Sequence, residues 1–185
     1  MMKLMLKCFS PLLLLFFFAC SQSTEEKNHF PVAAFLQEEL SRIDSLPIAV
    51  IRSRETNGLS DTTVMNKKEF RTLAMQLMGI DLREKKYQNN YQELVLEDAA
   101  LGNISIGYTT DDPDLPIRKI ELNIDASTNK IKSIFAERQE KESGKLLIKK
   151  ILWTSSTELM VNTSVYKEGQ LLNNLTERYN WAIGN

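Results

Sequence analysis

The segment Ile117–Asp125, IRKIELNID, is the part of the chain in which apolar and polar side chains alternate most clearly. Neighbouring side chains of an extended strand project to opposite faces, so Ile120, Leu122 and Ile124 share one face and the polar residues between them share the other. The pattern predicts a strand of an antiparallel sheet that has one face in the core and one face in water.

Similar short runs occur from residue 91 to the end of the chain, separated by turn residues at the spacing of an antiparallel meander. They are rich in Ile, Val, Leu, Tyr and Thr, which favour strands. We predict seven strands here: Gln92–Glu97, Ile104–Thr109, Ile117–Asp125, Lys130–Arg138, Lys145–Thr154, Glu158–Lys167 and Gln170–Trp181.

Two of these strands carry further predictions. The last strand places its large apolar residues on one face: Leu171, Leu175, Tyr179 and Trp181. Lys145–Thr154 carries apolar residues on both faces: Leu146, Ile148 and Leu152 on one, and Leu147, Ile151 and Trp153 on the other. We therefore expect Lys145–Thr154 to be a central strand that is covered on both sides.

Residues 31–45 predict an amphipathic helix, because Pro31 suits a first helical turn and apolar residues recur at intervals of three and four. Pro47 disfavours the helical conformation at Leu46 and ends the helix there. Two strands follow, Ile48–Thr56 and Leu59–Met65, joined by Asn57-Gly58, the dipeptide typical of a type I′ hairpin turn.

A second helix is predicted between Asn66 and Gly79. Asn66 and Glu69 have the spacing of a capping box, and an apolar stripe runs from Phe70 to Met78. The segment Ile80–Asn90 is charged and polar, and we expect a loop or a short helical turn there.

Together these elements predict an α+β fold: a twisted antiparallel β-meander sheet of about seven to nine strands with two amphipathic helices packed on one face. The chain length suits a single domain, assigned to residues 30–185. This outline resembles the open half-barrels of periplasmic lipoprotein carriers and of their outer-membrane receptors, which is a likeness of fold alone.

The N-terminus has the pattern of a signal peptide, assigned to residues 1–19. Lys3 and Lys7 precede the apolar stretch Phe9–Ala19, which is shorter than the roughly 20 residues that cross a bilayer as a helix. A leader that is removed on export accounts for this pattern better than a membrane span does.

The leader ends in Phe17-Phe18-Ala19-Cys20, which resembles the lipobox of bacterial lipoproteins. The resemblance implies cleavage before Cys20, lipidation of Cys20 and attachment to a membrane, with residues 20–29 as a lipidated tether. Ser21 stands where Asp would signal retention in the inner membrane, so the resemblance implies the bacterial outer membrane, facing the periplasm or the cell surface. Ordinary secretory cleavage a few residues later is the alternative.

Composition excludes several classes of site. Cys8 and Cys20 are the only cysteines, so the exported domain has no disulfide, no thiolate metal site and no cysteine nucleophile. Without the two leader lysines, the chain has 21 basic and 24 acidic residues. This small negative net charge argues against a nucleic-acid partner. His29 is the only histidine, and we expect it to be a surface residue at the boundary between the tether and the first helix.

Two polar clusters have a possible chemical role. Asp111, Asp112 and Asp114 could offer oxygen ligands to calcium, but they lack the glycine and the later glutamate of a calcium loop, so we predict a solvated hairpin tip. Residues 155–157, Ser-Ser-Thr, have no neighbouring base and are predicted to form a polar turn.

No set of residues with complementary catalytic roles is visible, and none suggests a cofactor or a metal. The sequence favours a non-catalytic envelope lipoprotein that binds or assembles with a protein partner or an apolar ligand. Two alternatives remain: a hydrolase acting through carboxylates such as Glu97 and Asp98, and an immunity or inhibitor lipoprotein that blocks a toxin.

Overall fold

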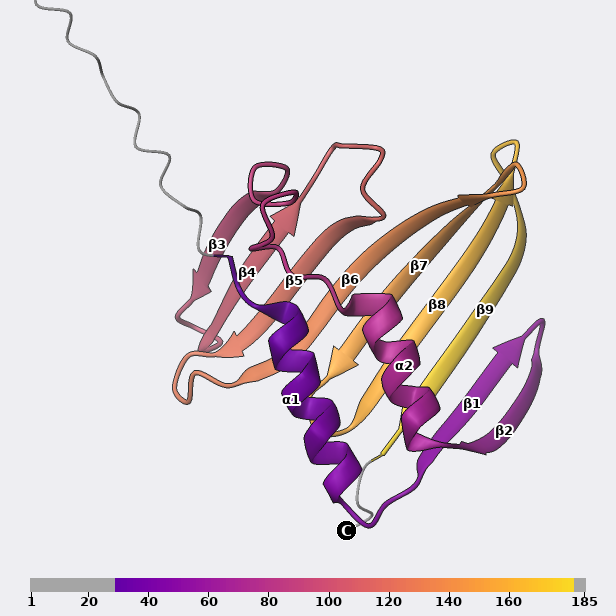
Figure 1. Ribbon diagram of the computed structural model, residues 1–185, viewed down its shortest axis with the longest axis horizontal. Helices are drawn as coiled ribbons and strands as arrows, with labels where there is room; N and C mark the ends of the chain where they lie inside the picture. The colour runs from indigo at the N-terminus through magenta and orange to yellow at the C-terminus, as the bar shows by residue number, and fades with distance from the viewer. Residues whose placement is uncertain (1–28, 182–185) are drawn as a thin grey trace, which may run out of the picture.

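The computed structural model describes residues 29–181, which form a nine-stranded antiparallel sheet with two helices on one face (Figure 1). The predicted signal peptide, the predicted lipidation site Cys20 and residues 21–28 of the predicted tether lie outside the described residues. Within the described part of the chain, no helix has the length and the apolar character needed to cross a membrane.

The elements follow one another in the predicted order, and their boundaries differ from the predictions by a few residues at most. They are α1 (Val32–Ser45), β1 (Val50–Thr56), β2 (Leu59–Met65), α2 (Lys67–Met78), β3 (Gln92–Asp98), β4 (Asn103–Thr109), β5 (Ile117–Asp125), β6 (Ile131–Glu142), β7 (Lys145–Thr154), β8 (Glu158–Lys167) and β9 (Gln170–Asn180).

The strand order across the sheet is β2-β1-β9-β8-β7-β6-β5-β4-β3. Strands β3 to β9 are a continuous meander, and the hairpin β1–β2 joins it beside β9, the last strand of the chain. Asn57 and Gly58 at the tip of this hairpin both have positive φ, as the predicted type I′ turn requires. The predicted α+β meander is therefore confirmed.

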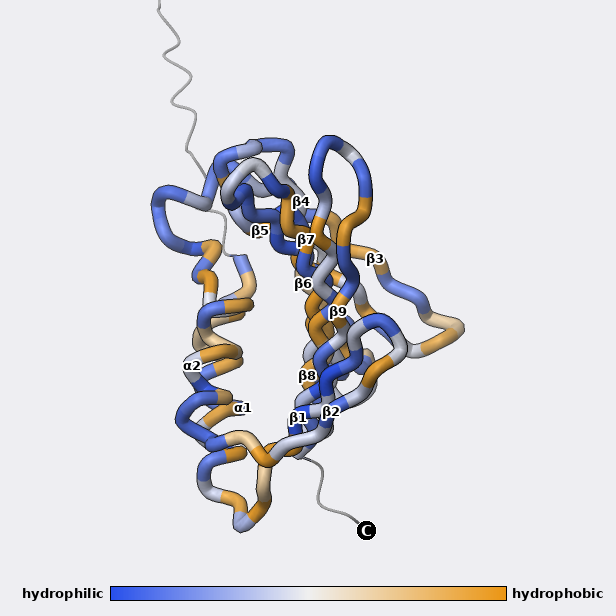
Figure 2. Tube along the Cα trace, turned by 90° about the vertical axis from the view of Figure 1, so that its right-hand side faces the viewer, coloured by the Kyte–Doolittle hydropathy of each residue, from blue (hydrophilic) through white to orange (hydrophobic). Residues whose placement is uncertain are grey.

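The alternation in β5 is confirmed as well. Ile120 and Leu122 are fully buried beneath the helices, where Leu122 lies between Ile106 of β4 and Ile134 of β6. Glu121 lies on the opposite face of the sheet, which we call the far face. Figure 2 shows both helices on the same side of the sheet, with orange apolar segments between the layers.

The core between helices and sheet is filled by aromatic rings. Phe70 of α2 lies with its ring centroid 5.3 Å from Trp181, 5.8 Å from Tyr179 and 6.2 Å from Trp153. The two tryptophan rings lie 4.8 Å apart. Ring contacts of this kind add to the free energy of apolar burial, so this cluster holds α2 against β7 and the end of β9.

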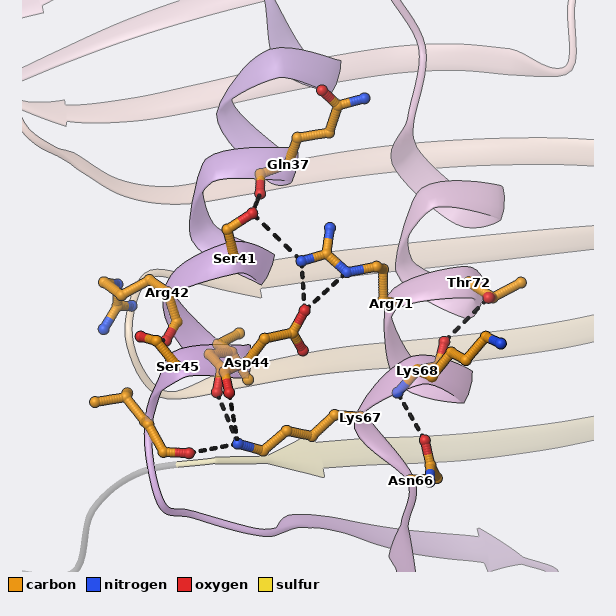
Figure 3. Close-up of polar contacts among 12 residues, drawn as sticks. Gln37, Ser41, Arg42, Asp44, Ser45, Asn66, Lys67, Lys68, Arg71 and Thr72 are labelled. Atoms are coloured by element: carbon orange, nitrogen blue, oxygen red, sulfur yellow. Dashed lines mark hydrogen bonds and ion pairs between the residues drawn. The ribbon is translucent and has the colours of Figure 1, made fainter.

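Polar contacts tie the two helices together at one end (Figure 3). The Lys67 ammonium donates hydrogen bonds to the carbonyls of Ile43 and Asp44, at 3.0 and 3.3 Å, and to that of Leu46. These carbonyls lie at the C-terminal end of α1, where the regular helical hydrogen bonds end; that of Ile43 also accepts a hydrogen bond from the Leu46 N–H at 3.3 Å. Arg71 adds a hydrogen-bonded ion pair with the Asp44 carboxylate at 2.5 Å.

The start of α2 differs from the predicted capping box. Asn66 is the cap, but its side chain accepts a hydrogen bond from the backbone N–H of Lys68, at 2.8 Å, and not from that of Glu69. The short asparagine side chain reaches the nearer of the two N–H groups that an N-cap residue can serve.

The prediction that β7 is covered on both sides is wrong in part. β7 is the middle strand of the sheet, but both helices lie on the face that carries Ile151 and Trp153. Leu146, Ile148 and Leu152 on the far face are partly exposed. Neighbouring strands shelter them, for example through Phe135 and Met160 on either side of Leu152, so a sheet face can be apolar without a covering layer. 

The predicted face of Leu171 is also wrong. Val165 of β8 pairs with Asn173, whereas the next residue, Tyr166, pairs with Leu171, so Leu172 is an extra residue in β9. A β-bulge of this kind reverses the alternation beyond it. Leu171 therefore projects to the far face together with Tyr166, opposite to the face of Leu175 and Tyr179.

Candidate interaction surface at strand β3

Strand β3 is the last strand on one side of the sheet and exposes an unusual number of apolar side chains. The exposed fractions are 61% for Leu94, 54% for Val95, 59% for Leu96 and 70% for Leu101, which lies in the turn to β4. Large apolar side chains gathered in this way on a surface mark interaction sites. We call these four residues the β3 surface.

The backbone of β3 is available on its outer side. β3 pairs with β4 over seven residues without a register shift, and no other described strand pairs with it. Alternate residues of an edge strand direct their N–H and C=O groups away from the sheet. Figure 2 shows that the end of β3 and its turn project away from the helices, and all seven residues of β3 are exposed.

A hollow of about 290 Å³ adjoins this surface on the far face. Its floor is Gly107 of β4, where the missing side chain leaves space between Leu94 of β3 and Glu121 of β5. Leu96 and Lys119 contribute further to its walls. The hollow has room for one large side chain of a partner, with apolar contacts on the β3 side and charges on the β5 side.

Acidic side chains border the apolar run of β3. Glu93 and Glu97 project to the same face as Val95, and Asp98 ends the strand. The Asp98 carboxylate accepts hydrogen bonds from the backbone N–H groups of Ala100 and Leu101, both at 3.0 Å, and so shapes the turn. Glu97 remains exposed at the end of the apolar run.

His29 is buried beside β3, so the prediction of a surface histidine is wrong. Its side chain is 1% exposed, with Nε2 at 3.2 Å from the Gln88 carbonyl and Nδ1 at 3.4 Å from the Glu93 carboxylate. The ring also packs edge-on against Tyr108 of β4, with the centroids 5.1 Å apart. The chain thus enters the domain next to the β3 surface, and His29 is packed within the domain, whereas the predicted tether extends to residue 29.

Tyr108 completes this attachment of the chain. Its hydroxyl accepts a hydrogen bond from the backbone N–H of Phe30 at 3.0 Å. Burial raises the pKa of the Tyr108 phenol to about 12, because the charged phenolate would lose its hydration. Tyr108 therefore stays neutral at physiological pH and holds Phe30 by an uncharged hydrogen bond.

Comparison of the chain with protein-family models, curated proteins and solved structures finds no match.

The other sites considered from the sequence are polar turns. Asp112 accepts hydrogen bonds from the backbone N–H of Asp114 and from the Asn90 side chain, within the connection between β4 and β5. Ser156, between β7 and β8, accepts one from Arg42 of α1 at 3.1 Å. Among residues 29–181, no three His, Cys, Asp or Glu side chains gather closely enough to hold a metal ion.

Glu97 and Asp98 do not form a facing pair. They are consecutive residues of β3, paired with Ile104 and Asn103, and consecutive strand residues project to opposite faces. A hydrolase that uses two carboxylates needs the two groups to face each other across the scissile bond, within one cleft. This arrangement gives the hydrolase alternative no support from these two residues.

A second hollow lies on the far face at the tips of the hairpins β6–β7 and β8–β9. It has a volume of about 260 Å³ and is lined by Leu146, Ile148 and Tyr166 together with the turn residues around them. Pockets for small ligands usually measure about 300–1,000 Å³ and enclose most of the ligand. This hollow is smaller than that and lies on an open sheet face.

The sequence contains a signal for the β3 surface that the strand predictions did not use. Leu94, Val95 and Leu96 are three consecutive apolar residues within a short strand, so they cannot all face one core. Such a run is either central and covered on both faces or exposed, and only the position of the strand in the sheet decides between the two.

Proposed function

We propose that this protein is a lipid-anchored module of the bacterial outer membrane that binds a protein partner through the β3 surface and catalyses no reaction. The observation that carries the proposal is the exposed run Leu94-Val95-Leu96 on an edge strand, beside Leu101 and the hollow over Gly107. Protein partners use apolar anchors of this kind, surrounded by polar groups.

The position of the surface agrees with a membrane-attached role. Nine residues, 20–28, separate the proposed lipid on Cys20 from His29, and nine residues can span at most about 30 Å. Because His29 packs beside Glu93 of β3, an anchor at Cys20 would hold the Glu93 end of β3 within about that distance of the membrane. A partner in or on the same membrane would be within reach. 

A protein partner accounts for the surface better than an apolar small ligand does. The space between helices and sheet is filled by the aromatic cluster around Phe70, and the hollows over Gly107 and beside Tyr166 are open and measure about 290 and 260 Å³. A larger hollow of about 500 Å³ has the charged residues Asp114, Arg118, Glu140 and Lys141 in its lining, which does not suit an apolar ligand. An immunity or inhibitor lipoprotein would use the same kind of surface and would differ from this proposal only in the identity of its partner.

Photo-crosslinking in cells tests the proposal. A photoreactive residue in place of Leu101 should give a discrete adduct, which should be lost when Leu94 and Leu96 are both changed to serine. Leu59, 79% exposed on the opposite edge strand β2, is the matched control position and should give no such adduct. Equal adducts from both positions, or none from Leu101, would contradict the proposal; a melting temperature checks that the double variant is folded.

A further inference from the structure

The two edges of the sheet are built differently. In β2, the exposed apolar residues Leu59 and Val64 are separated by the polar run Ser60–Thr63. In β3 the exposed apolar residues are consecutive. Natural sheets protect their edges with charged side chains, proline, bulges or very short strands; β3 has no proline and no bulge, and its charged residues, Glu93, Glu97 and Asp98, are all acidic. The consecutive apolar run and the single sign of charge therefore distinguish β3 from β2, and they suit a paired strand of complementary charge.

We infer that β3 receives an extended segment of the partner as a tenth strand, and that this segment carries basic residues on both sides of a short apolar run. The inference rests on the proposed function, since it names the way in which the partner binds. Backbone hydrogen bonds to the outer side of β3 would hold the segment in place, as in other cases where a peptide extends a sheet.

Charge complementarity specifies the basic residues. Glu93 and Glu97 lie on one face of β3 with Val95 between them, so a paired strand would place residues four positions apart directly opposite the two carboxylates. Lysine or arginine at those two positions would form cross-strand pairs with them. Apolar residues between would lie against Leu94, Val95 and Leu96, and a large one could reach the hollow over Gly107.

The same charges argue against a second copy of this chain as the occupant. If two β3 strands paired with their apolar runs aligned, an antiparallel arrangement would place Glu93 opposite Glu97 of the other copy. A parallel arrangement would place each glutamate opposite itself. Like charges directly opposite each other destabilise a strand pair, so these acidic residues select for a basic segment and against self-association.

A synthetic peptide tests the inference on the isolated, folded domain without the leader and the lipid. The probe is a capped heptapeptide with lysine at its second and sixth positions and leucine or valine between them; a second peptide has glutamate in place of both lysines. We expect the lysine peptide to bind the wild type at submillimolar concentration, by fluorescence anisotropy, and the glutamate peptide to bind at least about threefold more weakly. 

Reversal of one of the two charges on the protein should remove most of this preference, because Glu93 would then still favour the lysine peptide while the new lysine favours the glutamate peptide. Glu97→Lys is exposed and is expected to leave the melting temperature unchanged while it weakens binding of the lysine peptide and strengthens binding of the glutamate peptide. Asp111→Lys makes the same change of charge in the exposed connection between β4 and β5, and should leave the preference as it is in the wild type. Amide exchange within Leu94–Leu96 should slow when the lysine peptide is bound, because at least one of these N–H groups faces outward.

Three results would overturn the inference: no binding of the lysine peptide up to 1 mM, equal binding of both peptides, or exchange protection that lies away from β3. Dimerisation of the wild type that blocks the peptide would assign the edge to a second copy and would overturn it too. If the lysine peptide does not bind but Leu101 gives an adduct in cells, the inference fails and the proposed function stands. If the lysine peptide binds but Leu101 gives no adduct in cells, strand addition at β3 is supported and the proposed function is contradicted.

Discussion

Lys67 occupies a position in which one side chain serves the ends of two helices. It lies in the first turn of α2, and its ammonium reaches carbonyls at the C-terminal end of α1. A positive charge is favourable at the C-terminal end of a helix, where the carbonyls point outward and carry partial negative charge. A cation is unfavourable at the N-terminal end of α2, where Lys67 itself stands. The hydrogen bonds to the end of α1 offset this cost.

Lys67→Met should lower the free energy of unfolding by about 1.5–3 kcal/mol, since the backbone carbonyls of Ile43, Asp44 and Leu46 lose a charged donor while the apolar stem is kept. Chemical denaturation measures the change. Lys68→Met is the matched control, because Lys68 is exposed on the same helix, and it should change the free energy by less than about 0.5 kcal/mol. Equal losses in the two variants would remove the special role of Lys67.

At the level of the element, the two faces of β5 differ sharply in their tolerance of charge. Leu122→Asp places a carboxylate in the core between Ile106 and Ile134 and should cost several kcal/mol of stability. Glu121→Lys changes only the far face, where Glu121 forms an exposed ion pair with Lys119, and should cost less than about 0.5 kcal/mol. Thermal melting distinguishes the two, and similar melting temperatures would refute the register of β5.

Strand β9 shows how an element can depart from its own sequence pattern. In the sequence, the apolar alternation of β9 runs without interruption from Leu171 to Leu175. In the structure, the bulge at Leu172 turns Leu171 to the far face. The bulge lies next to the turn at Glu168 and Gly169, both of which have positive φ. The geometry of the hairpin connection therefore decides the register at this end of the strand, and apolar periodicity decides it at the other.

At the level of the whole molecule, the proposed anchor determines which environment the β3 surface meets. Cys20→Ala should abolish metabolic labelling with fatty acid and release the protein from the membrane fraction, because Cys20 is the residue that the lipobox resemblance marks for acylation. Serine substitution of Cys8 within the leader is the matched control and should change neither result. Normal processing of the Cys20→Ala protein, together with a wild type that was never membrane-bound, would contradict the lipoprotein proposal.

The sequence alone determined the elements and their types. Alternation in Ile117–Asp125 predicted β5 with its buried face, three- and four-residue spacing predicted α1 and α2, and Asn57-Gly58 predicted the hairpin turn. These predictions succeeded because each depends on neighbours within a few residues, where backbone geometry alone relates sequence spacing to direction in space.

Only the tertiary structure decided what lies at the edges and on the two faces of the sheet. The pairing of β1 with β9 leaves β3 as an outer strand and exposes Leu94-Val95-Leu96, and the choice of one face by both helices leaves the far face of β7 uncovered. His29 is buried for the same kind of reason, through contacts with residues about 60 to 80 positions away. Such contacts depend on which distant strands become neighbours, and no local pattern of the chain carries that information.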